Sequence, residues 1–192
     1  MCPPDDFIGE QMAYLPEAPG RGRVFTEKKF PDETLAFWEK TALPDDATVV
    51  HVTLYPYRGE RVVLPWHEGK AVLPEDDARE GESAEATVRR VALQQCGISE
   101  LDFTHLGHFK CKATVHSKLL PAGTVTYRVL YGVDVGALAD FPTSPGYERR
   151  IVMQRDLLAL VRERYWEHWK EYLEALDEFV LARAKRALAS QN

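Results

Sequence analysis

Apolar and polar residues alternate with two different periods along this chain, and each change of period predicts a new element. After Thr48, the segments VVHVTLYPY and RVVLPW have period two around the turn Arg58-Gly59-Glu60, which predicts two antiparallel strands. Residues 83–96 instead repeat apolar side chains every three or four positions, which predicts an amphipathic helix. Ser83 is its expected N-cap, and Gly97 can take the positive φ that ends a helix.

The segment after this helix predicts the rest of a sheet. One strand is expected from about His105 to His116, and TVTYRVLYGVDVG (124–136) alternates clearly enough to predict another. The segment ERRIVMQRDLLALV (148–161) predicts a short last strand that leads into a closing helix. The sheet should therefore span residues 48 to about 153, with the helix at 83–96 on one face.

The N-terminal region has a different character. Residues 1 to about 30 are rich in Pro and Gly, which predicts an extended wrap with a short edge strand at Val24 and Phe25. Asp32 is expected to cap a short helix over ETLAFWEKTAL (33–43). Three apolar residues would share the buried face of that helix: Leu35, Trp38 and Leu43.

The C-terminal region contains no Gly or Pro from Arg155 to Ala189, which predicts one long helix. Its apolar residues follow three- and four-residue steps, and four aromatic residues lie near its start: Tyr165, Trp166, Trp169 and Tyr172. We expect these aromatic side chains to pack on the sheet or on the N-terminal wrap. The alternative is a homodimer interface, where aromatic residues are enriched.

Composition narrows the class of protein. The net charge of −6 argues against general nucleic-acid binding, which needs a basic surface. The three cysteines have neither metal-ligand spacing nor an even number for disulfides, which favours a reduced, cytoplasmic setting. The N-terminus lacks the basic and apolar regions of a signal peptide, and no apolar run is long enough to cross a membrane.

The segment LPEDDAREGESAEATVRRVALQQCGI (73–98) resembles the Nudix box, G-x5-E-x7-R-E-U-x-E-E-x-G-U, in which U is a bulky aliphatic residue. Aligned on Gly97 and Ile98, the box arginine falls on Arg90 and its first glutamate on Glu82, and both match. Four other box positions differ, because the leading glycine falls on Asp76 and the three later glutamates fall on Val91, Gln94 and Gln95.

This resemblance implies an α/β fold, a Nudix-like α/β/α sandwich with a mixed sheet. It covers residues 47–162, between an N-terminal wrap and short helix at 1–46 and a helical extension at 163–192. In the family, Glu82 and Arg90 would form a structural ion pair, and the three later glutamates would bind magnesium.

The replaced glutamates change the expected chemistry. Mg²⁺ prefers anionic oxygen ligands in a near-octahedral arrangement. Val91 offers no ligand, and Gln94 and Gln95 offer only neutral oxygens. Without the metal, the negative charge of a pyrophosphate is not neutralised and the attacking water is not activated. We therefore expect no cofactor, and Mg²⁺ only if other carboxylates have taken over its binding.

Other candidate groups are weaker. Glu82 and Glu85 are the carboxylates to consider as relocated metal ligands or catalytic groups, although a solvated acidic loop is the simpler interpretation. His105 and His108 lie three apart in a predicted strand, so they should face opposite sides and share no metal. No spacing demands that His51 and His67 meet across the first hairpin.

Three hypotheses about function remain. The first is a Nudix-fold protein that has lost magnesium-dependent hydrolysis and binds a phosphate-containing or other small ligand. The second is an active Nudix hydrolase of a nucleoside diphosphate-linked substrate. The third is an interaction module that dimerises through the C-terminal helix. The missing glutamates favour the first hypothesis over the second.

Overall fold

The computed structural model describes residues 27–30, 32–140, 142–161 and 169–189, and the strands of these residues form one sheet. The strands are β1 (Glu27–Lys29), β2 (Thr34–Glu39), β3 (Val49–Arg58), β4 (Arg61–His67), β5 (Lys70–Ala71), β6 (Glu75–Asp77), β7 (Ile98–Ala113), β8 (Val125–Leu138) and β9 (Tyr147–Met153). The helices are α1 (Ala84–Cys96), α2 (Gln154–Val161) and α3 (Trp169–Ala189).

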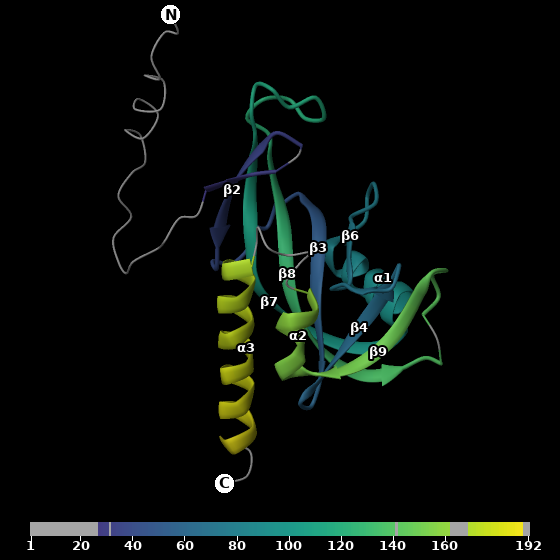
Figure 1. The fold of residues 1–192 in the computed structure, drawn as a ribbon. Coiled ribbons are helices and arrows are strands. Elements are labelled where there is room, and N and C mark those ends of the chain that lie inside the picture. Colours follow the sequence, from purple (N-terminus) through teal and green to yellow (C-terminus); the bar gives the residue numbers. More distant parts are fainter. Residues whose placement is uncertain (1–26, 31, 141, 162–168, 190–192) are drawn as a thin grey trace, which may run out of the picture.

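The sheet is mixed. Its main order is β1-β2-β7-β8-β3-β4-β5, while β6 pairs with β3 and β9 pairs with β4. The β3–β8 pair is parallel, and the other pairs are antiparallel. The two long strands β7 and β8 form the middle of the sheet (Figure 1). The predicted hairpin at Arg58–Arg61 is confirmed.

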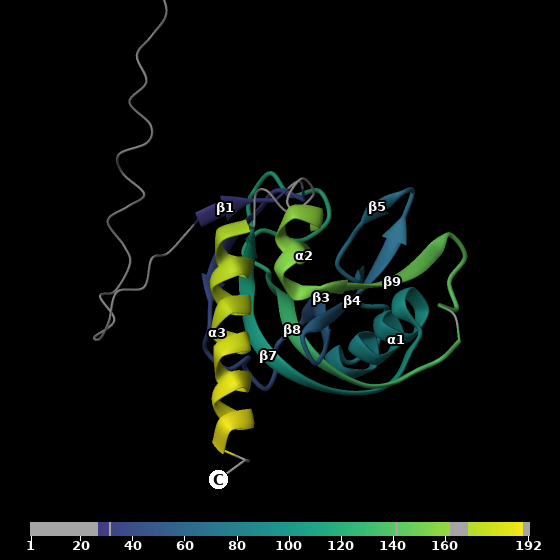
Figure 2. The same ribbon diagram turned by 60° about the horizontal axis from the view of Figure 1, so that its bottom comes forward.

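Helices cover both faces of this sheet, as the two ribbon views show (Figure 1, Figure 2). On one face, Val88, Val91 and Ala92 of α1 pack in an apolar cluster with Val52 and other sheet residues. The second cluster joins α2 and α3 to the opposite face through four helix side chains: Leu157, Tyr172, Leu176 and Phe179. The predicted α/β/α sandwich is therefore confirmed.

Helix α1 begins and ends where the sequence predicts. The Oγ of Ser83 accepts a hydrogen bond of 3.2 Å from the backbone N–H of Ala86. Gly97 has φ 65° and donates its N–H to carbonyls of the last turn, because a residue without Cβ takes this conformation at little cost.

The helix predicted at residues 33–43 is wrong. Residues 34–39 form β2, which pairs with β7 over its whole length. Asp32 does not cap a helix; its Oδ1 accepts hydrogen bonds from the backbone N–H and the hydroxyl of Thr34. Trp38 is buried and Leu35 only half-buried, since neighbouring odd and even positions of a strand face opposite sides. Pairing with an available sheet edge outweighs the helix propensity of this segment.

Strand β7 also differs from its predicted bounds. It starts at Ile98 directly after the Gly97 cap and ends at Ala113, three residues before the predicted end at His116. Irregularities in its register with β8 allow a continuous strand of 16 residues to follow the twist of the sheet.

The single C-terminal helix is not confirmed. The structure describes α2 and α3, which lie side by side in both ribbon views (Figure 1, Figure 2). Tyr172 of α3 is buried and packs against Trp38 and Phe109 of the sheet, with ring centroids 5.9 and 6.2 Å apart. Tyr172 therefore packs within its own chain, as predicted for these aromatic residues. Four residues named in the predictions lie outside the described part of the chain: Val24, Phe25, Tyr165 and Trp166.

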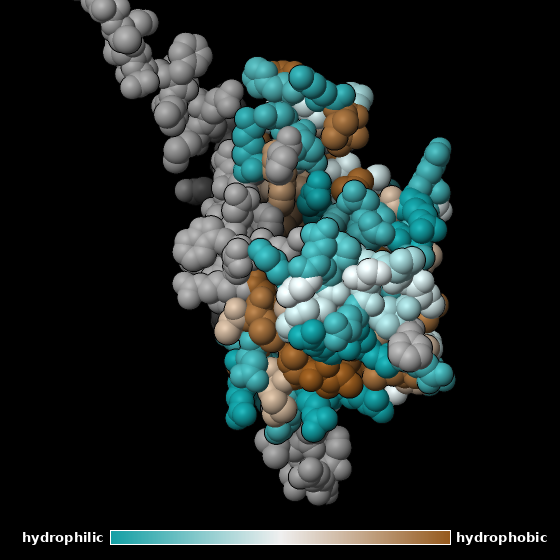
Figure 3. Space-filling view, turned by 45° about the vertical axis from the view of Figure 1, so that its right-hand side comes forward, coloured by the Kyte–Doolittle hydropathy of each residue, from teal (hydrophilic) through white to brown (hydrophobic). Residues whose placement is uncertain are grey.

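None of the helices described here has both the length and the hydropathy needed to span a bilayer. Figure 3 shows a face that is mostly hydrophilic, with a hydrophobic band along its lower part and smaller hydrophobic patches near its top. Large exposed apolar side chains in the described part include Leu181 of α3.

Candidate functional site

Arg90 fastens the acidic loop before α1 to the helix itself. Its Nε and Nη2 donate hydrogen bonds of 2.8 and 2.9 Å to the two carboxylate oxygens of Glu82. Its Nη1 lies 2.7 Å from Asp76 Oδ2, and Nη2 also donates to the carbonyl of Asp77. The Arg90 and Glu82 side chains are only 11% and 14% exposed, so this ion pair between the loop and the helix is largely shielded from solvent.

The ion pair with Arg90 determines the protonation state of Glu82. The Arg90 hydrogen bond lowers the pKa of the Glu82 carboxyl from 4.5 to about 2. The backbone N–H of Arg79 donates to the same carboxylate at 3.0 Å. Glu82 is therefore ionised at neutral pH and already bonded through both oxygens, which leaves it poorly placed to bind a metal.

Arg90→Ala is expected to lower the free energy of unfolding at pH 7 by about 2 kcal/mol, between the values for exposed and buried ion pairs. The folded pKa of Glu82 lies below its unfolded value of 4.5, so its contribution is complete above about pH 4.5. That contribution is lost as the pH falls toward 2, and the cost of the substitution should shrink with it. Urea denaturation at pH 7 and pH 3 measures both effects.

Arg89→Ala is the matched control for this prediction. Arg89 pairs with Glu85 one turn away on the same helix, but both side chains are more than half exposed, at 53% and 61%. Its loss should cost only about 0.3 kcal/mol. Equal stability of the Arg90→Ala and Arg89→Ala proteins at pH 7 would contradict a structural role for the Arg90–Glu82 pair.

The three positions where the box has metal-binding glutamates are occupied by structural contacts. Val91 is fully buried in the apolar cluster beneath α1. The Gln95 Nε2 donates a hydrogen bond of 2.8 Å to the carbonyl of Glu75, whose N–H donates back to Gln95 Oε1 at 3.2 Å. Gln94 is half-buried, and its Oε1 lies 3.4 Å from Arg90 Nη1.

This set of side chains does not fit the magnesium ion that the box resemblance implies. Mg²⁺ needs several oxygen ligands, preferably anionic, on one side of the ion. Here Val91 has no donor atom, the Gln95 oxygen is already bonded, and Gln94 lies beside a cationic guanidinium. Within the described ranges, no three His, Cys, Asp or Glu side chains converge on a possible metal position.

A second polar group lies across the sheet from the Arg90 network. His51 Nδ1 lies 2.8 Å from Asp77 Oδ1, and its Nε2 lies 3.9 Å from Glu75 Oε2. Burial alone would lower the pKa of His51, but the hydrogen bonds to Asp77 and Glu75 outweigh it, and the net shift is upward. His51 thus helps to hold β6 on β3. His67 has different contacts, stacking on Tyr147 with the ring centroids 4.7 Å apart.

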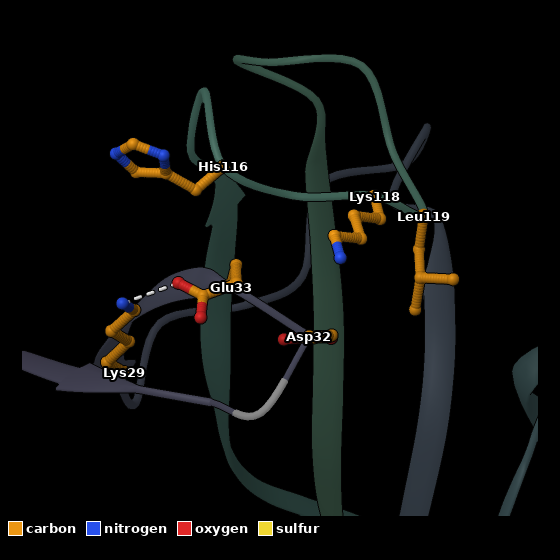
Figure 4. A pocket seen from close by; sticks show the side chains of 6 residues that line it. All are labelled: Lys29, Asp32, Glu33, His116, Lys118 and Leu119. Carbon is orange, nitrogen blue, oxygen red and sulfur yellow. Dashed lines mark ion pairs between the residues drawn. The ribbon is translucent and has the colours of Figure 1, made fainter.

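A hollow of about 670 Å³ lies between the β1–β2 turn and the loop after β7. Six side chains line it: Lys29, Asp32, Glu33, His116, Lys118 and Leu119 (Figure 4). The side chains of Lys118 and Leu119 point from the loop after β7 toward the β1–β2 turn (Figure 4). This hollow was not predicted, because its two sides, residues 29–33 and 116–119, are 83 to 90 residues apart in the sequence and no local pattern joins them.

The prediction that His105 and His108 face opposite sides of their strand is wrong. His105 Nε2 and His108 Nδ1 lie 3.1 Å apart. The register of β7 against β8 shifts between His105 and Gly107, so one extra residue on β7 brings both rings to the same side. Gly107 could have indicated this bulge from the sequence, since an isolated glycine in a strand often marks one.

Comparison with known proteins identifies the fold. No protein-family model and no curated protein matches this sequence. Two of the solved structures that are similar to this chain have TM-scores of at least 0.50. One is a pyrophosphohydrolase of Bacillus subtilis, with 18% identity and a TM-score of 0.51 over 66% of this chain and 77% of that one. The other is a Nudix hydrolase of Nitrosomonas europaea, with 14% identity and a TM-score of 0.50 over 70% of this chain and 90% of that one. The chain therefore has the fold of the Nudix hydrolases.

Proposed function

We propose that this chain is a Nudix-fold protein that does not hydrolyse pyrophosphate bonds with magnesium and instead binds a small phosphate-containing ligand. The observation that carries the first part is the Gln95 side chain, hydrogen-bonded to both backbone groups of Glu75. A glutamate there would lose the donor to the Glu75 carbonyl. The side-chain amide of Gln95 thus holds the loop against α1, at the position where the family has a metal-binding glutamate.

Relocated carboxylates are less well supported. Glu82 and Glu85, the candidates for such a role, each accept hydrogen bonds from an arginine, Arg90 and Arg89 respectively. A magnesium ion would have to compete with these guanidinium groups. The interaction-module hypothesis has no support from Tyr172 of α3, which is buried against its own sheet.

The hollow beside Lys118 is the proposed ligand site, because its charges favour an anion. Both of its acidic side chains already have cationic partners: Glu33 pairs with Lys29, and Asp32 with Arg128 at 2.9 Å. Lys118 is exposed and has no carboxylate partner within the described part of the chain. When Arg128, which pairs with Asp32 but does not line the hollow, is counted, Lys118 remains as one cation without a compensating carboxylate. The volume of the hollow is in the usual range for small-ligand sites.

Calorimetric titration with pyrophosphate, without metal, tests the proposal. We expect saturable binding that weakens about tenfold in Lys118→Ala, since a charge-assisted contact contributes about 1.5 kcal/mol or more. The matched control is Lys112→Ala, which removes an exposed lysine of β7 outside the hollow and should leave the affinity unchanged. Absence of binding by the unmodified chain, or equal losses in the two variants, would contradict the proposed site.

A further inference from the structure

We propose that His105 and His108 form a binding site for a late first-row divalent metal ion such as Zn²⁺, separate from both the box helix and the hollow beside Lys118. The two imidazoles come from one strand, and their facing nitrogens lie 3.1 Å apart. Two observations support this inference: the geometry of that nitrogen pair, and the half-buried carboxylate of Glu39 beside His108.

The nitrogen separation suits a shared ion. Zn²⁺ binds imidazole nitrogens at about 2.0–2.1 Å, so two nitrogens 3.1 Å apart subtend an angle of about 100° at the metal. This value lies between the ideal octahedral and tetrahedral angles. In the metal-free protein, a single proton joins the two rings in a hydrogen bond. The metal would take the place of that proton after a small rotation of His105, which is only partly buried.

Glu39 occupies the position of a supporting carboxylate. Its Oε2 lies 3.5 Å from the Nε2 of His108, on the side of the ring away from His105. His108 is fully buried, and this Nε2 makes no hydrogen bond, which is uncommon for a buried polar atom. Metal-binding histidines usually donate their second N–H to a carboxylate or carbonyl. Binding at Nδ1 would strengthen the Nε2–H···Glu39 contact and satisfy this atom.

The fold holds the two rings in place. Trp38 covers Gly107, the glycine of the bulge, so closely that a Cβ there would lie 2.4 Å from the Trp38 ring. Any larger residue at position 107 would displace the bulge that brings the histidines together. The ring of Tyr127 packs against His108 with the centroids 5.3 Å apart, at 70°. The site is thus preorganised, although the described residues supply only two ligands and water must complete the coordination.

Calorimetric titration of the full chain with Zn²⁺ at pH 7 tests the inference. We expect one equivalent to bind saturably, and His105→Asn to weaken that binding at least tenfold. The control is His67→Asn, which removes a histidine of β4 that stacks on Tyr147 and should leave the affinity unchanged. Glu39→Gln keeps the fold and both ligands, and should weaken binding about tenfold through the orientation of His108.

Thermal unfolding provides an independent readout, because an ion that binds only the folded chain raises the unfolding temperature. Zn²⁺ should raise it in the unmodified and His67→Asn proteins but not in His105→Asn. Failure of Zn²⁺ to bind the unmodified chain would overturn the inference. Undiminished binding by a folded His105→Asn protein would do the same, because the ion would then lie elsewhere.

Discussion

Val91→Glu is expected to lower the free energy of unfolding by about 4 kcal/mol or more, the largest effect of any box substitution. Val91 is 0% exposed and packs among apolar residues of α1 and the sheet, including Val88 and Val63. A carboxylate there would be buried without a partner, or would have to take up a proton at pH 7, which also costs free energy. Urea denaturation at pH 7 measures the loss, and far-UV circular dichroism checks that the variant folds.

Gln94→Glu is the matched control three residues along the same helix. Gln94 is half-buried with its side-chain oxygen near Arg90, so a carboxylate gains a cationic neighbour. Its stability should stay within about 0.5 kcal/mol of the unmodified chain. Equal stability of Val91→Glu and Gln94→Glu would show that the side chain at position 91 reaches solvent, and that the helix face remains open to a metal ligand there.

Phe179→Ala is expected to cost about 3–4 kcal/mol, because the ring fills the space between α3 and the sheet. Phe179 is 5% exposed and lies edge-on to Tyr55 and Tyr57. Its ring also rests on Gly132 of β8, where an added Cβ would lie 2.7 Å from the Phe179 Cζ. Gly132→Ala alone should therefore cost about 1–2 kcal/mol through overpacking.

The double variant Phe179→Ala with Gly132→Ala tests whether the Phe179 ring packs on Gly132. In Phe179→Ala the space above Gly132 is empty, so the added methyl group should fit there and the combined loss should be smaller than the sum by about 1 kcal/mol. Leu181→Ala is the control on the same helix, since Leu181 is 60% exposed and its loss should cost little. Strict additivity of the two substitutions in thermal or urea denaturation would argue that α3 does not pack on Gly132.

The parts of the fold that follow from local pattern were predicted well. The hairpin around Gly59, the helix from Ala84 and its Gly97 cap depend on short-range periodicity and on backbone conformations that only certain residues favour. Residues 34–39 were mispredicted, because their strand is fixed by pairing with β7, more than 60 residues away in the sequence. Propensity within one segment does not contain that information.

In the site, too, the features that depend on local sequence were predicted and those that depend on strand register were not. The alignment of the box placed Arg90 and Glu82 eight residues apart across the loop and helix, a local relation, and the structure brings their side chains together. The His105–His108 contact depends on one inserted residue in the register of β7 against β8. Alternation assigns opposite faces to positions three apart, and a single bulge reverses that assignment.

The most direct test of the account is hydrolysis by the unmodified chain in millimolar Mg²⁺ at neutral pH. Nucleoside triphosphates, ADP-ribose and dinucleoside polyphosphates are the substrates to use, each with and without EDTA. We predict no release of product above the protein-free rate in either condition, because Val91, Gln94 and Gln95 supply no anionic ligand. Glu80→Gln, which changes an exposed carboxylate of the loop before α1, is the control. Magnesium-dependent turnover that is removed by EDTA and by Glu82→Gln or Glu85→Gln, but kept by this control, would contradict the account and establish relocated carboxylates as the metal site.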